Sequence, residues 1–402
     1  MHSIRRSGHS ALQLRHAVLF PRTTFRTFSH TPHHQRGALP VFLPASTPEL
    51  SELLGVLNSK ILLPWHLTPA QQKLVFRASN RAKLEAEPIE ITLGEVTLPL
   101  EHINRTHDVP GQEKQFRLIM KSSTTREDWE NVVRMLEGFE NAKVRVKSAW
   151  AEWVVKRLGE EGYQHLILKA LQRGPGSGLR LTEWGTMVEV LKAVRDKAAK
   201  AGWEQEALQK ALRMAEQVVE LMDEDQHLGK VSGEKDWRSH PAVVGTVLEL
   251  ASELAYRHKG DEEKVKTLAG RLMNALEQRN YISDEQPNDI SELHKLAAQT
   301  PDSFSSYNSQ LQALTVLMRQ MLAMIPVWNG LSTSRTVLED AMPMPQEAEK
   351  VQRKIWDALE ASLKGLDVLT MRDEKTIGDH LRLHMAEYTR DAIKRCQDDG
   401  DE

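Results

Sequence analysis

The chain has 402 residues, a net charge of −3 at neutral pH, 40% hydrophobic residues and 27% charged residues. This composition is typical of a globular protein, and it excludes indiscriminate coating of nucleic acid through bulk charge. The length exceeds that of a usual single core, so two packed regions or an array of elements are expected. The single cysteine, Cys396, excludes an intramolecular disulfide framework and a cysteine-based zinc site.

The first 48 residues contain no Asp or Glu but carry six arginines, at positions 5, 6, 15, 22, 26 and 36. An acid-free, Arg-rich and Ser/Thr-rich leader is typical of a mitochondrial transit peptide. The segment Arg26-Thr27-Phe28-Ser29 resembles a matrix-processing site. We therefore expect a transit peptide over residues 1–28 and a mature protein in the mitochondrial matrix. A disordered basic tail is the alternative.

The next part of the chain predicts a linker and a small mixed module. Residues 29–48 are rich in His, Pro, Thr and Ser, and we assign residues 29–64 to a linker. Thr68 and Pro69 then predict the start of a helix, with Thr as N-cap and Pro at the first helical position. Apolar residues alternate over residues 89–100 on both sides of a Gly-Glu turn, which predicts a β-hairpin. A lone hairpin is only marginally stable, so it should pack on neighbouring helices of this 65–111 module.

From Gly111 onward the apolar residues recur with helical period, and glycines mark the ends of the predicted helices. We divide this part into a repeat-like region over residues 112–300 and a C-terminal helical region over residues 301–402. The fold class is therefore mainly α, an irregular helical-hairpin, solenoid-like array with one small β-hairpin near the N-terminus. The predicted helices span residues 113–121, 126–139, 147–158, 163–172, 182–200, 204–222, 241–257, 261–279, 285–298, 303–324, 345–364 and 375–395.

Two approximate copies of a helix–loop–helix pattern are visible, with Trp150 and Trp184 at a spacing of 34 residues. Gly162 and Tyr163 open a helix that contains Ala170 and Leu171, and residues 179–182 open its partner helix. Over about residues 125–200 this pattern resembles the pentatricopeptide repeat family of organelle proteins. The Pro-Asp that the family has at the loop's end is absent here. The resemblance implies paired antiparallel helices, and it implies no readable nucleotide code.

The basic segment of residues 143–200 is the leading candidate for a binding site. It holds twelve Lys and Arg against six acids, with Trp150, Trp153, Tyr163 and Trp184 interleaved. Cations for phosphates and aromatic faces for unstacked bases are what single-stranded RNA contact requires. Two alternatives remain: the aromatic residues pack between helices and the cations are solvated, or the segment binds an acidic protein. Lys143, Arg145 and Lys147 stand at alternate positions, so in an extended loop all three would point the same way. The candidate contact residues are Lys143, Arg145, Lys147, Lys169, Arg173 and Arg180.

Other motifs favour structural interpretations. The acidic residues of 204–225 are expected to form a solvated helix face, and His380 and His384 a surface pair rather than a metal site. Residues 174–178 lack the Lys-Ser/Thr of a phosphate loop and are expected to be a flexible interhelical connection. No apolar run reaches the roughly 18 residues of a membrane helix, since Arg319, Gln320 and Pro326 interrupt the closest one.

These observations favour an imported, non-catalytic helical scaffold or adaptor in mitochondrial gene expression. Its expected partners are mitochondrial RNA or the mitochondrial ribosome, together with other mitochondrial proteins. We expect no cofactor, no metal, no small-molecule substrate and no membrane span. One alternative is a protein-binding assembly or maturation factor for a respiratory complex, and another is an enzyme with a helical fold and no recognisable motif.

Overall fold

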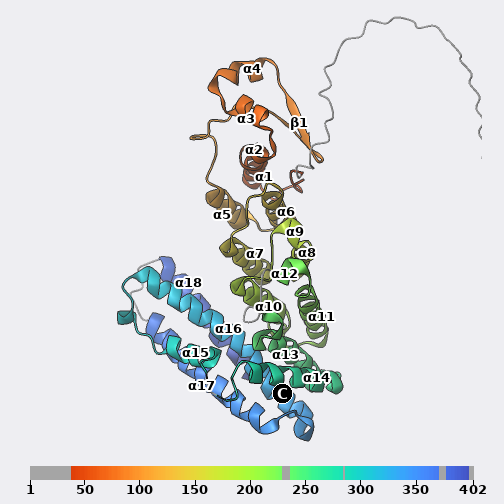
Figure 1. Ribbon diagram of the computed structural model, residues 1–402, viewed down its shortest axis with the longest axis vertical. Coiled ribbons are helices and arrows are strands. Elements are labelled where there is room, and N and C mark those ends of the chain that lie inside the picture. Colours follow the sequence, from red (N-terminus) through yellow and green to blue (C-terminus); the bar gives the residue numbers. More distant parts are fainter. Residues whose placement is uncertain (1–37, 229–235, 284–285, 371–376, 398–402) are drawn as a thin grey trace, which may run out of the picture. The chain divides into compact units, whose positions relative to one another are not determined.

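The computed structural model describes residues 38–228, 236–283, 286–370 and 377–397. In this part of the chain the structure is mainly helical, and its one sheet is a two-stranded antiparallel hairpin (Figure 1). The predicted fold class is therefore confirmed. The predicted transit peptide, residues 1–28, lies outside the described residues.

The segment predicted as the second half of the linker is helical and buried instead. Thr47 caps α1 (Pro48–Val56), and its side chain accepts a hydrogen bond from the Leu50 N–H at 3.2 Å. A π-helix, η1 (Leu57–Leu62), follows and continues into α2 (Leu63–His66). Leucines of all three elements belong to the core. The π turn interrupts the 3.6-residue period, which explains why periodicity alone did not reveal these helices.

The remainder of the N-terminal module follows the prediction. Thr68 forms a capping box at the start of α3 (Pro69–Phe76). The hairpin pairs β1 (Glu90–Leu93) with β2 (Val96–Pro99), and its half-buried apolar side chains pack on the hydrophobic core. The connecting elements are η2 (Ala78–Asn80) and α4 (Arg81–Ala86).

A strap of irregular chain, residues 38–47, is anchored on the next helices by buried polar side chains. Asp128 accepts hydrogen bonds from the N–H of Ser46 (3.0 Å), the hydroxyl of Ser46 (2.6 Å) and the N–H of Thr125 (3.0 Å). Burial by itself raises the pKa of Asp128, but these hydrogen bonds outweigh it and lower the pKa to about 2. Asn131 exchanges two hydrogen bonds with the backbone of Leu43. The strap is thus fixed by charge-assisted bonds rather than left as a free connection.

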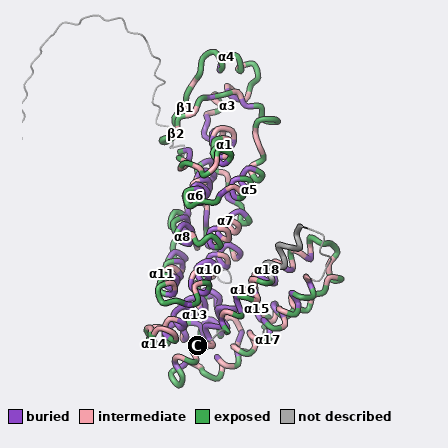
Figure 2. The backbone as a smooth tube through the Cα atoms, turned by 180° about the vertical axis from the view of Figure 1, so that it is seen from behind, coloured by how far each residue is buried: buried purple, intermediate pink, exposed green. Residues whose placement is uncertain are grey.

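Each helix predicted after residue 111 corresponds to a helix of the structure, but those predicted over residues 303–324 and 345–364 run further than predicted, and the short helical elements at residues 174–177, 225–228, 237–239, 301–303 and 339–341 were not predicted. The helices pack on one another, both between sequence neighbours and between helices further apart in the sequence, and many of their residues are buried (Figure 2). The elements are α5 (Gln112–Ser122), α6 (Arg126–Asn141), α7 (Ser148–Glu160), α8 (Gln164–Gln172), α9 (Gly174–Ser177), α10 (Trp184–Ala199), α11 (Gln205–Leu221), α12 (Asp225–Leu228), η4 (Trp237–Ser239), α13 (Pro241–His258), α14 (Glu262–Gln278), α15 (Asp289–Ala297), η5 (Pro301–Ser303), α16 (Tyr307–Leu338), η6 (Glu339–Ala341), α17 (Pro345–Thr370) and α18 (Ile377–Gln397).

Helix α16 does not end near Met324 as predicted, because it continues through Pro326 and Gly330. Its backbone packs closely on α13: a Cβ on Gly245 would lie 2.9 Å from Val327, and one on Gly330 would lie 3.1 Å from the Glu249 nitrogen. The burial gained along this contact offsets the hydrogen bond that proline cannot donate. By length and composition Tyr307–Ala341 could cross a membrane, but 56% of its apolar window is buried, and a core helix passes the same test.

A buried polar network joins α10, α13, α16 and α18. Arg195 donates to both carboxylate oxygens of Glu249, at 2.6 and 2.8 Å, and Asn329 donates to Glu249 at 2.9 Å and to Glu253 at 3.0 Å. Arg195 also lies 2.9 Å from the sulfur of Cys396 on α18. Burial raises the pKa of the Cys396 thiol to about 12, so at neutral pH it is a protonated packing group and not a nucleophile.

The contacts of the C-terminal helices cross the predicted boundary at residue 300. Helix α13 packs along α16, α15 packs along α17, and α10 also touches α16. Residues Gly37–Glu402 cluster as one unit. The predicted regions 112–300 and 301–402 are therefore parts of one packed structure, and their use as separate modules stays a prediction.

Candidate functional site

The loop between α6 and α7 presents the alternating cations outward. Lys143 adopts a left-handed conformation (φ 57°) just past the end of α6, and its N–H donates to the Glu140 carbonyl at 2.8 Å. Val146 is buried and Val144 half-buried, whereas Lys143, Arg145 and Lys147 are exposed. The predicted alternation is confirmed: two valines hold the loop on the core, and three cations face solvent.

The ammonium group of Lys147 has two partners within the chain, an aromatic ring and a carboxylate. Its ammonium lies 5.3 Å from the centre of the Trp150 ring and 3.4 Å from a carboxylate oxygen of Glu113 on α5. Hydrogen bonds from Arg117 and Lys147 lower the pKa of Glu113. Both partners of the Lys147–Glu113 pair are exposed, so the pair contributes little to stability and leaves Lys147 free to exchange partners.

The other three candidate cations, Lys169, Arg173 and Arg180, belong to later parts of the chain and lie beside α6. Arg173 is 3.4 Å from Glu137, and Arg180 is 3.5 Å from Glu140, one turn further on the same helix. Lys169 and Arg173, together with Arg134, line a groove of about 390 Å³ between α6, α8 and the strap. All three candidates (Lys169, Arg173, Arg180) are exposed.

The loop of residues 143–147 and the segment that carries Arg180 meet at the C-terminal end of α6. Residues 174–178, predicted as a flexible connection, form the helical turn α9 and end at Gly178 with φ 68°. A Cβ on Gly178 would lie 2.6 Å from Glu140 and 2.9 Å from Val146. This close approach brings the 143–147 loop beside Arg180. The structure thus places the 143–147 loop and Arg180 at the C-terminal end of α6, and Lys169 and Arg173 beside the C-terminal half of that helix.

The aromatic residues of this segment pack on the core: Trp150 is buried, and Trp153, Tyr163 and Trp184 are half-buried, which favours the packing alternative over free base-stacking faces. Trp150 is 5% exposed and stacks on Phe116 with ring centres 4.6 Å apart. Trp153 packs edge-on against Phe116, and Trp184 packs between Trp237 and His240. Helical spacing that interleaves aromatics with cations also describes a helix that buries one face and exposes the other. In this segment the candidate cations are exposed, whereas the rings are engaged in packing contacts.

The acidic segment pairs with other partners. Glu216 forms an ion pair with Lys264 of α14, and Asp223 lies 2.9 Å from Arg238. Among the ion pairs of the described residues, none joins this segment to the six candidate cations. No group of three or more His, Cys, Asp or Glu side chains in the described part of the chain could hold a metal ion. The side chains of His380 and His384 lie outside the described residues.

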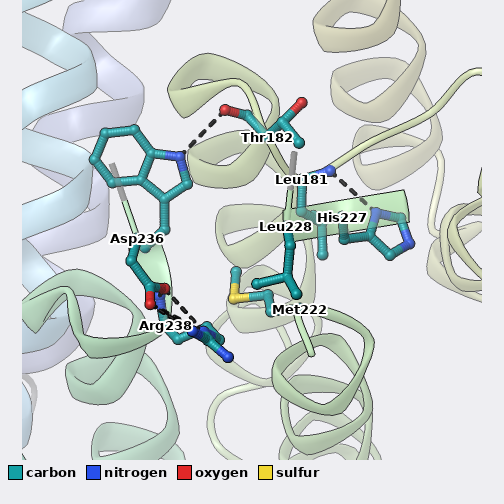
Figure 3. A pocket seen from close by; sticks show the side chains of 8 residues that line it. Leu181, Thr182, Met222, His227, Leu228, Asp236 and Arg238 are labelled. Carbon is teal, nitrogen blue, oxygen red and sulfur yellow. Dashed lines mark hydrogen bonds and ion pairs between the residues drawn. The ribbon is translucent and has the colours of Figure 1, made fainter. Parts of the chain in front are cut away.

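A small cavity lies where α11, α12 and η4 meet the segment before α10, and Figure 3 shows its lining. Its volume of about 30 Å³ has room for a single water molecule, not a substrate. His227 is a structural bridge there: its Nδ1 accepts from the Leu181 N–H at 3.2 Å, and Nε2 donates to the Leu171 carbonyl at 3.0 Å. Burial lowers the pKa of His227, which keeps the ring neutral for this role.

Sequence reasoning missed one surface, the groove beside Trp65 in the N-terminal module. Trp65 is 59% exposed, more than any other large hydrophobic side chain of the described residues. A signal was present, because residues 53–84 contain five Lys and Arg and no Asp or Glu. This signal does not by itself predict the groove, because the sequence does not show that the side chain of Trp65 stays exposed.

Comparison with known proteins identifies the family. The model of the Mrp13 family, described as mitochondrial ribosomal protein mS27, matches residues 26–389. The small ribosomal subunit protein mS27 of Neurospora crassa is 25% identical over 223 residues, which is 54% of this chain and 56% of that protein. The chain thus spans about half the length of the curated relative that it matches. The family match supports a mitochondrial location. Because the match covers nearly the whole chain, the protein belongs to the mitochondrial ribosomal protein mS27 family.

Proposed function

We propose that this chain is a non-catalytic helical scaffold of the mitochondrial ribosome, located in the matrix, which contacts ribosomal RNA and neighbouring proteins. The family match over residues 26–389 is the observation that carries the proposal. It favours the ribosome over a respiratory-complex client, the alternative that the sequence alone left open. A ribosomal protein family also supports a role without catalysis. The pentatricopeptide-like pairing of helices stays a prediction.

The contact surface in this proposal is the set of six cations around the end of α6. Exposed Lys and Arg side chains neutralise phosphates and release counterions, and this contribution does not depend on sequence. Because the neighbouring rings are packed inside the protein, the surface would position RNA through its backbone and would not select bases. Arg173 and Arg180 would exchange Glu137 and Glu140 for phosphates, at small cost because these ion pairs are long and both guanidinium groups are exposed.

Charge reversal tests the proposal. The variant with Lys143→Glu, Arg145→Glu and Lys147→Glu should lose co-sedimentation with the mitochondrial small subunit and crosslinking to its RNA. Removing three phosphate contacts should also flatten the salt dependence of binding, by roughly 0.7–0.9 in log–log slope per contact. The unfolding transition should remain nearly unchanged, since exposed charges contribute little to stability.

A matched control carries the same change in net charge on α17: Lys350→Glu, Arg353→Glu and Lys364→Glu, three exposed positions. This control should sediment with the subunit as the unmodified protein does. Unchanged co-sedimentation and crosslinking of the 143/145/147 variant would refute the basic-surface proposal. Isolation of the native complex with and without ribonuclease separates RNA-dependent from protein-dependent association. Respiratory subunits in place of ribosomal ones would select the alternative.

A further inference from the structure

The strongest unassigned surface is the groove beside Trp65. The chain has nine tryptophans, and the other eight are buried or half-buried in the described structure. Trp65 lies on α2, where its neighbours Leu63, His66 and Leu67 point into the core and are at most 3% exposed. A single exposed hydrophobic side chain is common on protein surfaces, but the indole of Trp65 lines a groove together with other apolar side chains, and such a grouping often marks a binding site.

The groove combines this aromatic face with cations. Its volume is about 380 Å³, within the usual range for ligand sites, and Trp65, Pro64 and Phe76 form its apolar wall. Lys60 and Arg105 line it as well, and the Arg105 guanidinium lies 4.0 Å from the centre of the Phe76 ring. No carboxylate occurs among the described residues that line it.

The surroundings extend the positive charge. Residues 53–84 contain no acid, and within them Lys73, Arg77, Arg81 and Lys83 are exposed. Two ion pairs reach this segment from outside it: Lys60 with Glu101 at 2.9 Å, and Arg81 with Glu85 at 2.9 Å. Each of these carboxylates offsets one cation, and Lys73, Arg77 and Lys83 remain as the local excess of positive charge. An apolar peptide would gain nothing from this excess of cations.

We infer that the groove beside Trp65 binds an unpaired nucleotide of RNA, with a base stacked on the indole and phosphates held by Arg105 and Lys60. Stacking on an exposed aromatic face with flanking cations is the chemistry by which proteins hold single-stranded RNA. The inference rests on the proposed function and deepens it: the end of α6 holds the RNA backbone, and the Trp65 groove takes a splayed base.

The test uses the full chain and a fluorescein-labelled single-stranded uridine octamer of RNA. Trp65→Ala should weaken binding about 5- to 150-fold, because stacking of one base contributes about 1–3 kcal/mol. Trp65→Phe should retain most of the affinity, and Arg105→Gln should reduce its salt dependence. Tyr256→Ala is the matched control, since Tyr256 is 47% exposed on another helix and should be neutral. With 5-iodouridine in the octamer, the crosslinked peptide should contain Trp65.

Three outcomes separate this inference from the proposed function. Octamer binding by Trp65→Ala within twofold of the unmodified chain, while the 143/145/147 variant binds weakly, overturns the groove and leaves the proposed function standing. A Trp65→Ala variant that loses ribosome co-sedimentation but keeps octamer affinity assigns the groove to a protein partner and overturns the RNA inference. Loss of octamer binding by Trp65→Ala, with normal ribosome association of the 143/145/147 variant, supports the groove and refutes the basic surface.

Discussion

The buried ion pair between α10 and α13 makes the sharpest prediction about stability. Glu249 is fully buried, Arg195 is 4% exposed, and two hydrogen bonds of 2.6 and 2.8 Å join them. Glu249→Gln keeps the shape of the side chain but removes its charge. The guanidinium would then stay buried without its counterion, which costs about 3–5 kcal/mol. Natural proteins have only about 5–15 kcal/mol of stability, so the loss would be a large part of the total.

Urea unfolding followed by far-UV circular dichroism measures this loss, and intrinsic fluorescence checks that both probes give one transition. Limited proteolysis should show earlier cleavage at α18, because Arg195 also holds the sulfur of Cys396 on that helix at 2.9 Å. Glu206→Gln is the matched control: its side chain is 78% exposed and pairs with Lys210, so we expect a change below about 0.5 kcal/mol.

A double variant distinguishes the loss of stability caused by one uncompensated buried charge from the net contribution of the ion pair to stability. Arg195→Met combined with Glu249→Leu replaces both charges by apolar groups, and it should recover most of the stability lost in Glu249→Gln. Asn329 keeps its bond to Glu253 at 3.0 Å in that background. A Glu249→Gln variant within about 1 kcal/mol of the unmodified protein would show that the reasoning about an uncompensated charge is wrong.

Three further predictions concern the same unfolding assay. Trp150→Ala should cost on the order of 3–5 kcal/mol, because Trp150 is 5% exposed and stacks on Phe116 at 4.6 Å; a loss under about 1 kcal/mol would contradict the packing. Asp128→Asn should cost about 1–3 kcal/mol and free the strap at Ser46. Because the folded pKa of Asp128 is depressed to about 2, the stability that this carboxylate contributes is present above pH 4 and is lost as pH falls toward 2. An equal loss of stability over that pH range in the Asp128→Asn variant would contradict this assignment. Burial lowers the pKa of His240, so the unfolded state takes up the proton first and the stability of the fold should fall as pH drops below about 6.5. His240→Gln should flatten this dependence of stability on pH. An unchanged dependence would show that another group causes it.

Much of the secondary structure could be predicted, because the helical period of apolar residues and the glycines that mark helix ends are signals from residues close together in the sequence. The predicted range 126–139 corresponds to α6 (Arg126–Asn141), and 241–257 corresponds to α13 (Pro241–His258). The hairpin over residues 89–100 followed from strict alternation around Gly94. The outward alternation of residues 143–147 was predicted for the same reason, since neighbours two apart in an extended loop share a side.

The continuation of α16 was not predictable, because proline and glycine in its sequence favour an end. Pro326 and Gly330 interrupt the local signal, but the long contact with α13 buries enough surface to keep the helix intact. The small Gly330 even serves that contact, since a Cβ there would lie 3.1 Å from the backbone of Glu249. At this point the burial of surface against α13 outweighs the local tendency of proline and glycine to end a helix.

The sequence by itself determined the helical class, the order of most elements, the hairpin and the positions of the clustered cations. Only the tertiary structure decided which side chains are exposed. Trp150 and Trp65 are chemically identical, yet one stacks on Phe116 inside the core and the other faces water. Exposure depends on partners far away in the chain, and a periodic pattern carries no information about which partner will cover a given face.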